Sequence, residues 1–248
     1  MKTSVTICFL LAGCVTADAR AEVAKIENAD VRVSFDLESG TYDVADARDG
    51  LVCVRGARGE VGDWSTADAA YARTARIENA PDGAGASRTL SVTCEAEGRP
   101  TLLLEFRVCD GAPHVALRGG WKNTGAAPLR VTRFSPMAGG AVFEGGAWEA
   151  VRTLTSQSGG NDPRVSRASA AESANVLLLT LTRDGARRSL VLGALRTAEF
   201  AKWASTRPGG GGARRAETAA ALPGARLAAY LDSRGDGGAP PPAAPAPP

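Results

Sequence analysis

The side chains that most often carry enzyme chemistry are sparse in this sequence. His114 is the one histidine among 248 residues, which argues against a histidine-based metal cluster and against a Ser-His-Asp triad with a spare base. His114 follows Pro113 on the outward phase of an expected strand, so we predict a surface residue. The glycines at 209–212 are followed by Ala213-Arg214-Arg215 rather than by Lys and Ser or Thr, so they are not a P-loop. We therefore expect no catalytic residue, no metal site and no cofactor.

Carboxylates offer the other route to acid–base chemistry, and the chain has 27 Asp and Glu residues. Glycoside hydrolysis needs two carboxyl groups at a defined separation around the scissile bond. No spacing in the sequence selects two of these residues above the others, and most carboxylates in proteins are solvated. Arg234-Gly235-Asp236 spells an adhesion tripeptide, but it lies in a low-complexity segment and we interpret it as a coincidence.

The four tryptophans are the remaining candidates for ligand contact. Trp64 lies in the polar stretch GDWST, where an exposed indole would suit stacking on a sugar ring. Packing beneath a loop is the commoner use of such a residue. We predict Trp64 as a weak carbohydrate contact. Trp121 is on the inward phase of its expected strand and is assigned to the core, whereas Trp148 and Trp203 lie near glycine-rich or loop segments.

Residues 1–21 are typical of an export signal. Lys2 supplies the positive end, and residues 5–11 form an apolar run that is too short to span a bilayer. Two cleavage patterns compete. Leu11-Ala12-Gly13-Cys14 resembles the bacterial lipobox, in which Cys14 would be lipidated, whereas Ala19-Arg20-Ala21 fits ordinary signal peptidase. Both predict an exported protein, either periplasmic or anchored to the membrane through a lipid.

The charge balance is close to neutral. Lys and Arg number 29 against 27 acidic residues, for a net charge of +2, so we expect no nucleic-acid partner and no membrane contact other than a lipid anchor. Three cysteines follow the export signal: Cys53, Cys94 and Cys109. A hairpin turning at Gly98 would place Cys109 about seven residues, or roughly 23 Å, from the position opposite Cys94, which is beyond disulfide reach. A bridge from Cys53 stays open.

Alternating apolar positions predict an antiparallel meander over residues 101–137, to which the rest of the chain adds strands. Asp110-Gly111 and Asn123-Thr124-Gly125 supply its turns. The apolar positions are Leu102, Leu104, Phe106 and Val108, then Val115, Leu117 and Trp121, then a third run at 129–134.

Further strands are expected on both sides of this meander. Residues 31–37 alternate cleanly, 41–44 and 51–54 follow after turns, and Leu90, Val92 and Cys94 lead into the meander. Residues 56–70 and 156–173 are polar and predict irregular segments. The nearly continuous apolar runs at 176–181 and 190–195 predict a hairpin in the middle of the fold, buried on both faces. A last strand is expected at 225–231.

These patterns indicate one all-β domain, a large antiparallel β-sandwich spanning residues 22–232, with ten or more strands. From Ser233 onward the chain is rich in Gly, Ala and Pro and ends in APPPAAPAPP, so we expect a disordered low-complexity tail at 233–248.

Four stretches, in this order, resemble the N-terminal β-sandwich of bacterial α-galactosidases of glycoside hydrolase family 36, of the supersandwich type. The resemblance covers roughly residues 25–232. The stretches are Trp121-Lys122-Asn123-Thr124-Gly125 with Pro128-Leu129 and Ser135, then Leu154-Thr155-Ser156-Gln157-Ser158-Gly159, then Ser189-Leu190-Val191-Leu192-Gly193-Ala194-Leu195 with Phe200, and then Ala225-Arg226-Leu227-Ala228-Ala229-Tyr230-Leu231-Asp232.

In that family the sandwich precedes a (β/α)₈ barrel that carries both catalytic aspartates, so the resemblance brings no catalytic residue to this chain. It implies a non-catalytic, exported, carbohydrate-associated module with α-galactosides as the expected ligand class. Loops of the family's sandwich can wall the sugar pocket or join subunits, and Trp64 is the position we assign to such a role. The change of composition after Asp232 suggests a truncated gene. Two alternatives remain: an α-galactosidase represented by an incomplete chain, and a structural or interaction lipoprotein that does not bind sugar.

Overall fold

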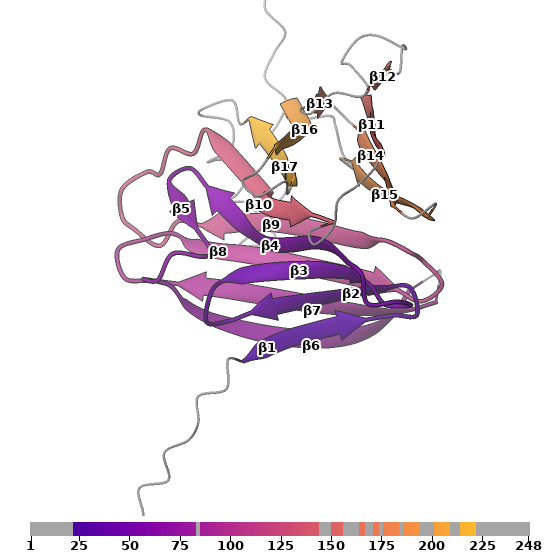
Figure 1. Cartoon of the computed structure of the whole chain (residues 1–248). Helices are drawn as coiled ribbons and strands as arrows, with labels where there is room; N and C mark the ends of the chain where they lie inside the picture. The colour runs from indigo at the N-terminus through magenta and orange to yellow at the C-terminus, as the bar shows by residue number, and fades with distance from the viewer. Residues whose placement is uncertain are drawn as a thin grey trace, which may run out of the picture.

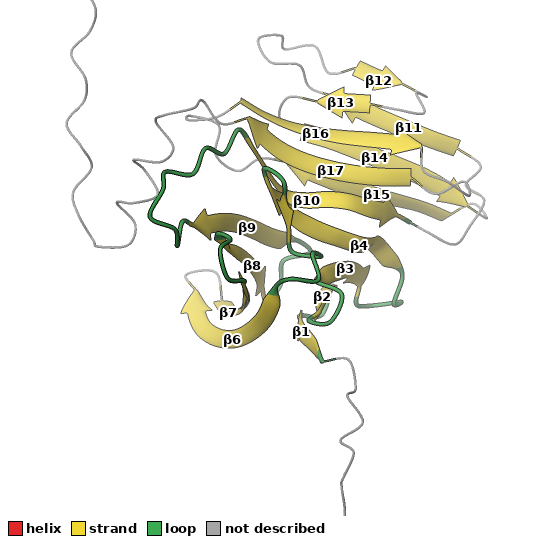
Figure 2. Ribbon diagram, turned by 90° about the vertical axis from the view of Figure 1, so that its left-hand side faces the viewer, coloured by secondary structure: helices red, strands yellow, loops and turns green. Residues whose placement is uncertain are grey.

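The computed structural model describes residues 22–82, 85–143, 150–155, 164–166, 171–173, 176–183, 186–193, 201–208 and 214–221. All regular elements in these ranges are β-strands, and every strand pair is antiparallel (Figures 1 and 2). The all-β antiparallel sandwich that the sequence predicts is therefore confirmed. The export signal, the strand expected at 225–231 and the C-terminal tail lie outside the described residues.

The strands form one long sheet and two short sheets. The long sheet runs in the order β1 (Val23–Glu27), β2 (Val31–Asp36), β3 (Thr41–Asp46), β4 (Val52–Val61), β10 (Arg133–Val142), β17 (Arg214–Ala221), β16 (Ala201–Pro208) and β13 (Ala171–Ser173), with β5 (Trp64–Ser65) paired to β4. The first short sheet runs β6 (Ala72–Asp82), β7 (Gly85–Glu95), β8 (Thr101–Cys109) and β9 (Val115–Lys122). The second short sheet runs β12 (Arg164–Ser166), β11 (Ala150–Thr155), β14 (Val176–Arg183) and β15 (Ala186–Gly193).

The core lies between the N-terminal part of the long sheet and the first short sheet (Figure 1). Phe35 and Tyr42 project from the long sheet, and Phe106 meets them from β8. The Tyr42 and Phe106 rings pack edge to face with their centroids 4.7 Å apart, a favoured geometry for aromatic pairs. The Tyr42 hydroxyl donates a 3.0 Å hydrogen bond to the Pro136 carbonyl, so this fully buried polar group is satisfied within the core.

The polar stretch at 56–70 is more regular than its composition predicts. Strand β4 continues to Val61, with Gly56 at a φ of +64° where the pairing with β3 shifts register. Beyond β5, the Thr66 hydroxyl donates to the Gly40 carbonyl at 2.7 Å and accepts from the Gly59 amide at 3.1 Å. The Arg73 guanidinium then donates to four backbone carbonyls, those of Leu37, Glu38, Thr66 and Asp68. Side-chain hydrogen bonds to the backbone order this loop, and polarity alone does not reveal them.

The third run of the predicted meander is placed wrongly by the sequence pattern. The strand begins at Arg133 instead of residue 129, and it joins β4 and β17 in the long sheet instead of β9. Of the glycine-rich stretch that follows Met137, Gly139 and Gly140 belong to this strand. A Cβ at Gly140 would lie 2.7 Å from Val54 Cγ1, so the close approach of β4 requires a residue without a side chain there.

The leucine-rich hairpin is confirmed as β14 and β15, but its predicted burial on both faces is wrong for β15. Strand β15 ends the order of the second short sheet, and Val191 on it is 61% exposed. Its neighbours Leu190 and Leu192 are half-buried against the core. The segment predicted as a surface loop at 156–173 contains the short strands β12 and β13.

Candidate functional site

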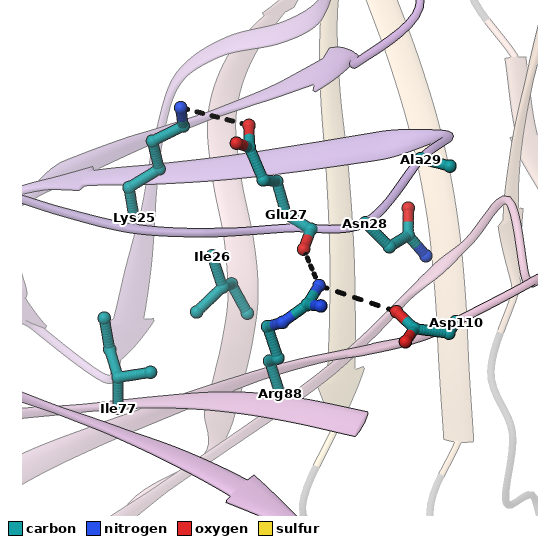
Figure 3. Close-up of a pocket in the computed structure, with 8 residues that line it drawn as sticks. All are labelled: Lys25, Ile26, Glu27, Asn28, Ala29, Ile77, Arg88 and Asp110. Carbon is teal, nitrogen blue, oxygen red and sulfur yellow. Dashed lines mark hydrogen bonds and ion pairs between the residues drawn. The ribbon is translucent and has the colours of Figure 1, made fainter. Parts of the chain in front are cut away.

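A pocket of about 510 Å³ opens at the side of the sandwich where β1 contacts β7 (Figure 3). It combines residues of the long sheet with residues of the first short sheet. Its lining consists of Lys25, Ile26, Glu27, Asn28, Ala29, Ile77, Arg88 and Asp110. Five of these side chains are charged or polar, namely Lys25, Glu27, Asn28, Arg88 and Asp110. The two isoleucines supply apolar surface.

Asn28 positions the wall of the pocket. It follows β1 directly, and its side-chain oxygen accepts hydrogen bonds from the amides of Asp30 at 2.9 Å and Val31 at 2.8 Å, which closes an Asx turn into β2. Its amide nitrogen donates to the carbonyls of Cys109 at 2.6 Å and Ala112 at 2.9 Å. Asn28 is buried and thereby ties the β1–β2 turn to the β8–β9 turn.

Arg88 lies between the two sheets at the centre of the pocket (Figure 3). Its Nη1 atom donates to the Glu27 carbonyl and lies 3.5 Å from Asp110 Oδ1. The guanidinium is therefore anchored at one nitrogen. Such an anchored fork presents its remaining N–H groups in a fixed direction.

Glu27 is held in its ionised form. Its Oε2 atom accepts a 2.7 Å hydrogen bond from Arg32 Nε and lies 3.0 Å from Lys25 Nζ. The hydrogen bonds from Arg32 and then from Lys25 lower the pKa of the Glu27 carboxyl below its usual value of 4.5. At neutral pH this carboxylate is an acceptor and cannot serve as the general acid that glycosidic cleavage needs.

The side chains of the pocket can bind a polar ligand. Anchored guanidinium, carboxylate and ammonium groups can exchange hydrogen bonds with a polar, hydroxyl-rich ligand, and Ile77, which is 48% exposed, can contact its apolar face. No cluster of three or more His, Cys, Asp or Glu residues able to hold a metal ion occurs among the described residues.

Trp64, the residue predicted to contact carbohydrate, does not line this pocket. It lies in β5, opposite Val61 of β4, and is half-buried against the core with its ring 3.6 Å from the position of a Cβ on Gly62. His114 is exposed just before β9, as expected. Cys14 lies outside the described residues.

Trp121 and the three cysteines lie among the described residues, whereas Trp148 lies outside them. Trp121 is half-buried, and its ring lies 5.8 Å from that of Phe134, between the two sheets. Cys94 lies opposite Leu102 and Cys109 opposite Ser87, so the predicted separation of the two cysteines is confirmed. No disulfide forms among Cys53, Cys94 and Cys109. The bridge from Cys53 that the sequence leaves open is therefore absent among these residues.

The sequence does not single out the residues that line the pocket. Asp110 is predicted only as part of a turn, and Lys25, Glu27 and Arg88 are indistinguishable in the sequence from other surface charges. The one local signal is Asn28-Ala29-Asp30 directly before an alternating run, which is typical of an Asx turn. Their assembly depends on the contact of β1 with β7, which no local pattern encodes.

Within the described ranges, no helix is long and apolar enough to cross a membrane. Among known proteins, no family model matches this sequence, and no curated protein matches it either.

Proposed function

We propose that this protein is a non-catalytic, exported β-sandwich module that associates with carbohydrate and is related to the N-terminal domain of family 36 α-galactosidases. The observation that best supports carbohydrate association is the pocket around Arg88, whose polar groups are held in place before any ligand arrives. Sugar hydroxyls donate and accept hydrogen bonds at once, and neighbouring guanidinium and carboxylate groups complement them. Pre-ordered groups lose little entropy on binding.

The proposed ligand class, α-galactosides, rests on the resemblance and not on the pocket. In that family the catalytic aspartates belong to the barrel and not to the sandwich. The ionised state of Glu27 fits a binding role because its carboxylate is committed to Arg32 and Lys25. In this proposal the protein binds the sugar without hydrolysing it.

Titration of the full chain with methyl α-galactoside, followed by amide NMR shifts, tests the proposal. We expect shifts centred on Asn28, Arg88 and Asp110 with millimolar-range affinity, the range that a shallow open site gives. The variant Arg88→Lys keeps the charge but loses the planar fork, and it should weaken binding. A matched control is Arg118→Lys, because Arg118 is an exposed arginine on β9 outside the pocket.

Two other outcomes would support the alternatives. An absence of shifts with α-galactosides and with other sugars would favour a structural or interaction protein. Release of the chromophore from a chromogenic α-galactoside by the purified chain would favour an enzyme. Tryptophan fluorescence in the same titration, repeated on Trp64→Ala, shows whether Trp64 contacts the sugar independently of the pocket.

Export is a separate part of the proposal, and it rests on residues 1–21. Labelling of the protein with a fatty-acid analogue in a bacterial host distinguishes the two cleavage patterns. Label that is lost in Cys14→Ser indicates a lipoprotein, whereas an unlabelled protein whose mature chain starts at Glu22 indicates ordinary signal peptidase. Retention of the complete chain in the cytoplasm would contradict both.

A further inference from the structure

Strand β6 forms an open edge of the first short sheet, and it is the longer of the two end strands of that sheet. It spans eleven residues, Ala72–Asp82, and among the described residues it pairs with β7 alone. Every residue from 74 to 80 is exposed, so both faces of the strand are open to solvent in addition to its edge. This exposure has a geometric cause: β1, the end strand of the long sheet, contacts β7, and β6 lies one strand further along the first short sheet. A long open edge of this kind is a template for strand addition.

We propose that a second copy of this chain occupies this edge, with the two β6 strands antiparallel about a two-fold axis at Ile77. Strand β6 is self-complementary around this residue. Ile77 is the middle residue of the strand, so this register pairs all eleven residues. It places Ile77, which is 48% exposed, against Ile77 of the second copy. It also places Arg76 opposite Glu78 twice, once on each side of the axis.

Neighbouring registers are disfavoured by charge. Centring the axis on Arg76 would set Arg76 against Arg76, and centring it on Glu78 would set Glu78 against Glu78. Arg76 Nη2 and Glu78 Oε1 already lie 2.7 Å apart within one strand, on the same face. In the proposed register the two pairs would join into a network of four alternating charges. Pro81, which lacks an N–H, lies near the end of the strand and removes one backbone donor at most.

The long sheets would not collide in this arrangement. Because β1 contacts β7, the two copies of β1 would be separated by the strand order β7, β6, β6, β7. At the usual strand spacing this is about 14 Å. The two copies of Ile77 would form the floor between them, and the pockets around Arg88 would face each other across this space. The proposed pairing rests on the residues of β6 and not on carbohydrate binding, and Ile77 is the residue of this strand that also lines the pocket.

Sedimentation velocity or light scattering of the full chain over a concentration series tests the pairing. We expect a concentration-dependent dimer. Arg76→Glu places like charges opposite each other and should raise the dimer dissociation constant at least tenfold. The double variant Arg76→Glu with Glu78→Arg restores alternating charges and should recover most of the affinity. Arg118→Glu, an equal charge change on β9, is the control and should leave the dimer unchanged.

Three results would overturn the proposal. A chain that stays monomeric across the full concentration range has no such interface. A dimer that Arg76→Glu leaves intact uses another surface. Failure of the double variant to recover affinity, with far-ultraviolet circular dichroism unchanged, would show that Arg76 and Glu78 do not face each other across the interface.

Discussion

The side-chain amide of Asn28 donates a 2.6 Å hydrogen bond to the backbone carbonyl of Cys109, which lies 81 residues further along the chain. This contact joins the end of a long-sheet strand to the end of a strand in the opposite sheet. It also holds Glu27 and Asp110 near each other, because these two pocket residues are the chain neighbours of Asn28 and Cys109. The geometry of the pocket and the registration of the sandwich therefore depend on the same side chain.

Asn28→Ala should destabilise the fold by about 2 to 3 kcal/mol, because it removes the four hydrogen bonds that the buried Asn28 side chain makes to backbone groups. Urea unfolding followed by circular dichroism measures the loss. Asn123→Ala is the matched control, since Asn123 is exposed and bonds only within its own loop, to Gly125 and Ala127. Its expected cost is below about 1 kcal/mol. Equal costs at the two sites would contradict the role of Asn28 between the sheets.

Gly119→Ala should destabilise the protein by about 1 to 3 kcal/mol through overpacking. A Cβ at Gly119 would lie 2.2 Å from Phe134 Cζ, whereas one at Gly120 would have no neighbour within 4 Å. Gly120→Ala is therefore the control and should be close to neutral. Thermal unfolding ranks the variants. Since Phe134 packs on Trp121, only the Gly119 variant should also shift the tryptophan emission.

Gly40→Ala and Gly50→Ala separate backbone strain from steric conflict. Both glycines have positive φ, +70° and +76°, so each alanine should cost about 1 to 2 kcal/mol in backbone strain. At Gly40 the new Cβ would also lie 1.9 Å from the Thr66 carbonyl oxygen, whereas at Gly50 nothing lies within 4 Å. We expect a total cost of about 3 kcal/mol or more at Gly40. Denaturant midpoints that coincide for the two variants would contradict this difference.

Stability should fall between pH 9 and 11 because of Cys94. Burial raises the pKa of its thiol from 9.0 to about 11. Because the folded-state pKa is raised, the buried neutral thiol contributes to the free energy of unfolding. This contribution is complete below pH 9 and is lost as pH rises through about 11. The loss at pH 10 should be about 1 kcal/mol. Urea midpoints at pH 8, 9 and 10 measure it before the tyrosines, whose ordinary pKa is 10.0, dominate.

Cys94→Ala should flatten this pH dependence, even though its baseline stability is lower, because the titrating group is absent. Cys53→Ala keeps Cys94 and should retain the dependence. A slope that is unchanged in Cys94→Ala would assign the alkaline loss to another group. Burial also raises the pKa of Tyr42 and of Tyr71, the latter to about 12, so a second loss with the same sign is expected at higher pH in both variants.

Much of the fold was predictable because it depends on local chemistry. An apolar residue at every second position must face a core, so the runs around Val33, Leu90 and Leu104 identify half-buried strands without knowledge of their partners. Asp110-Gly111 likewise identifies a turn, since glycine adopts the φ of +74° found there at no steric cost.

Tertiary structure decided the order of the strands and everything that depends on it. Strand β10 enters the long sheet because the backbone of Gly140 can approach Val54, a fit between residues far apart in sequence. The pocket likewise exists because β1 contacts β7 and brings Glu27 beside Arg88. Alternation specifies which face of a strand is buried, but the choice of neighbouring strand depends on packing between distant segments, and the sequence holds no local pattern for it.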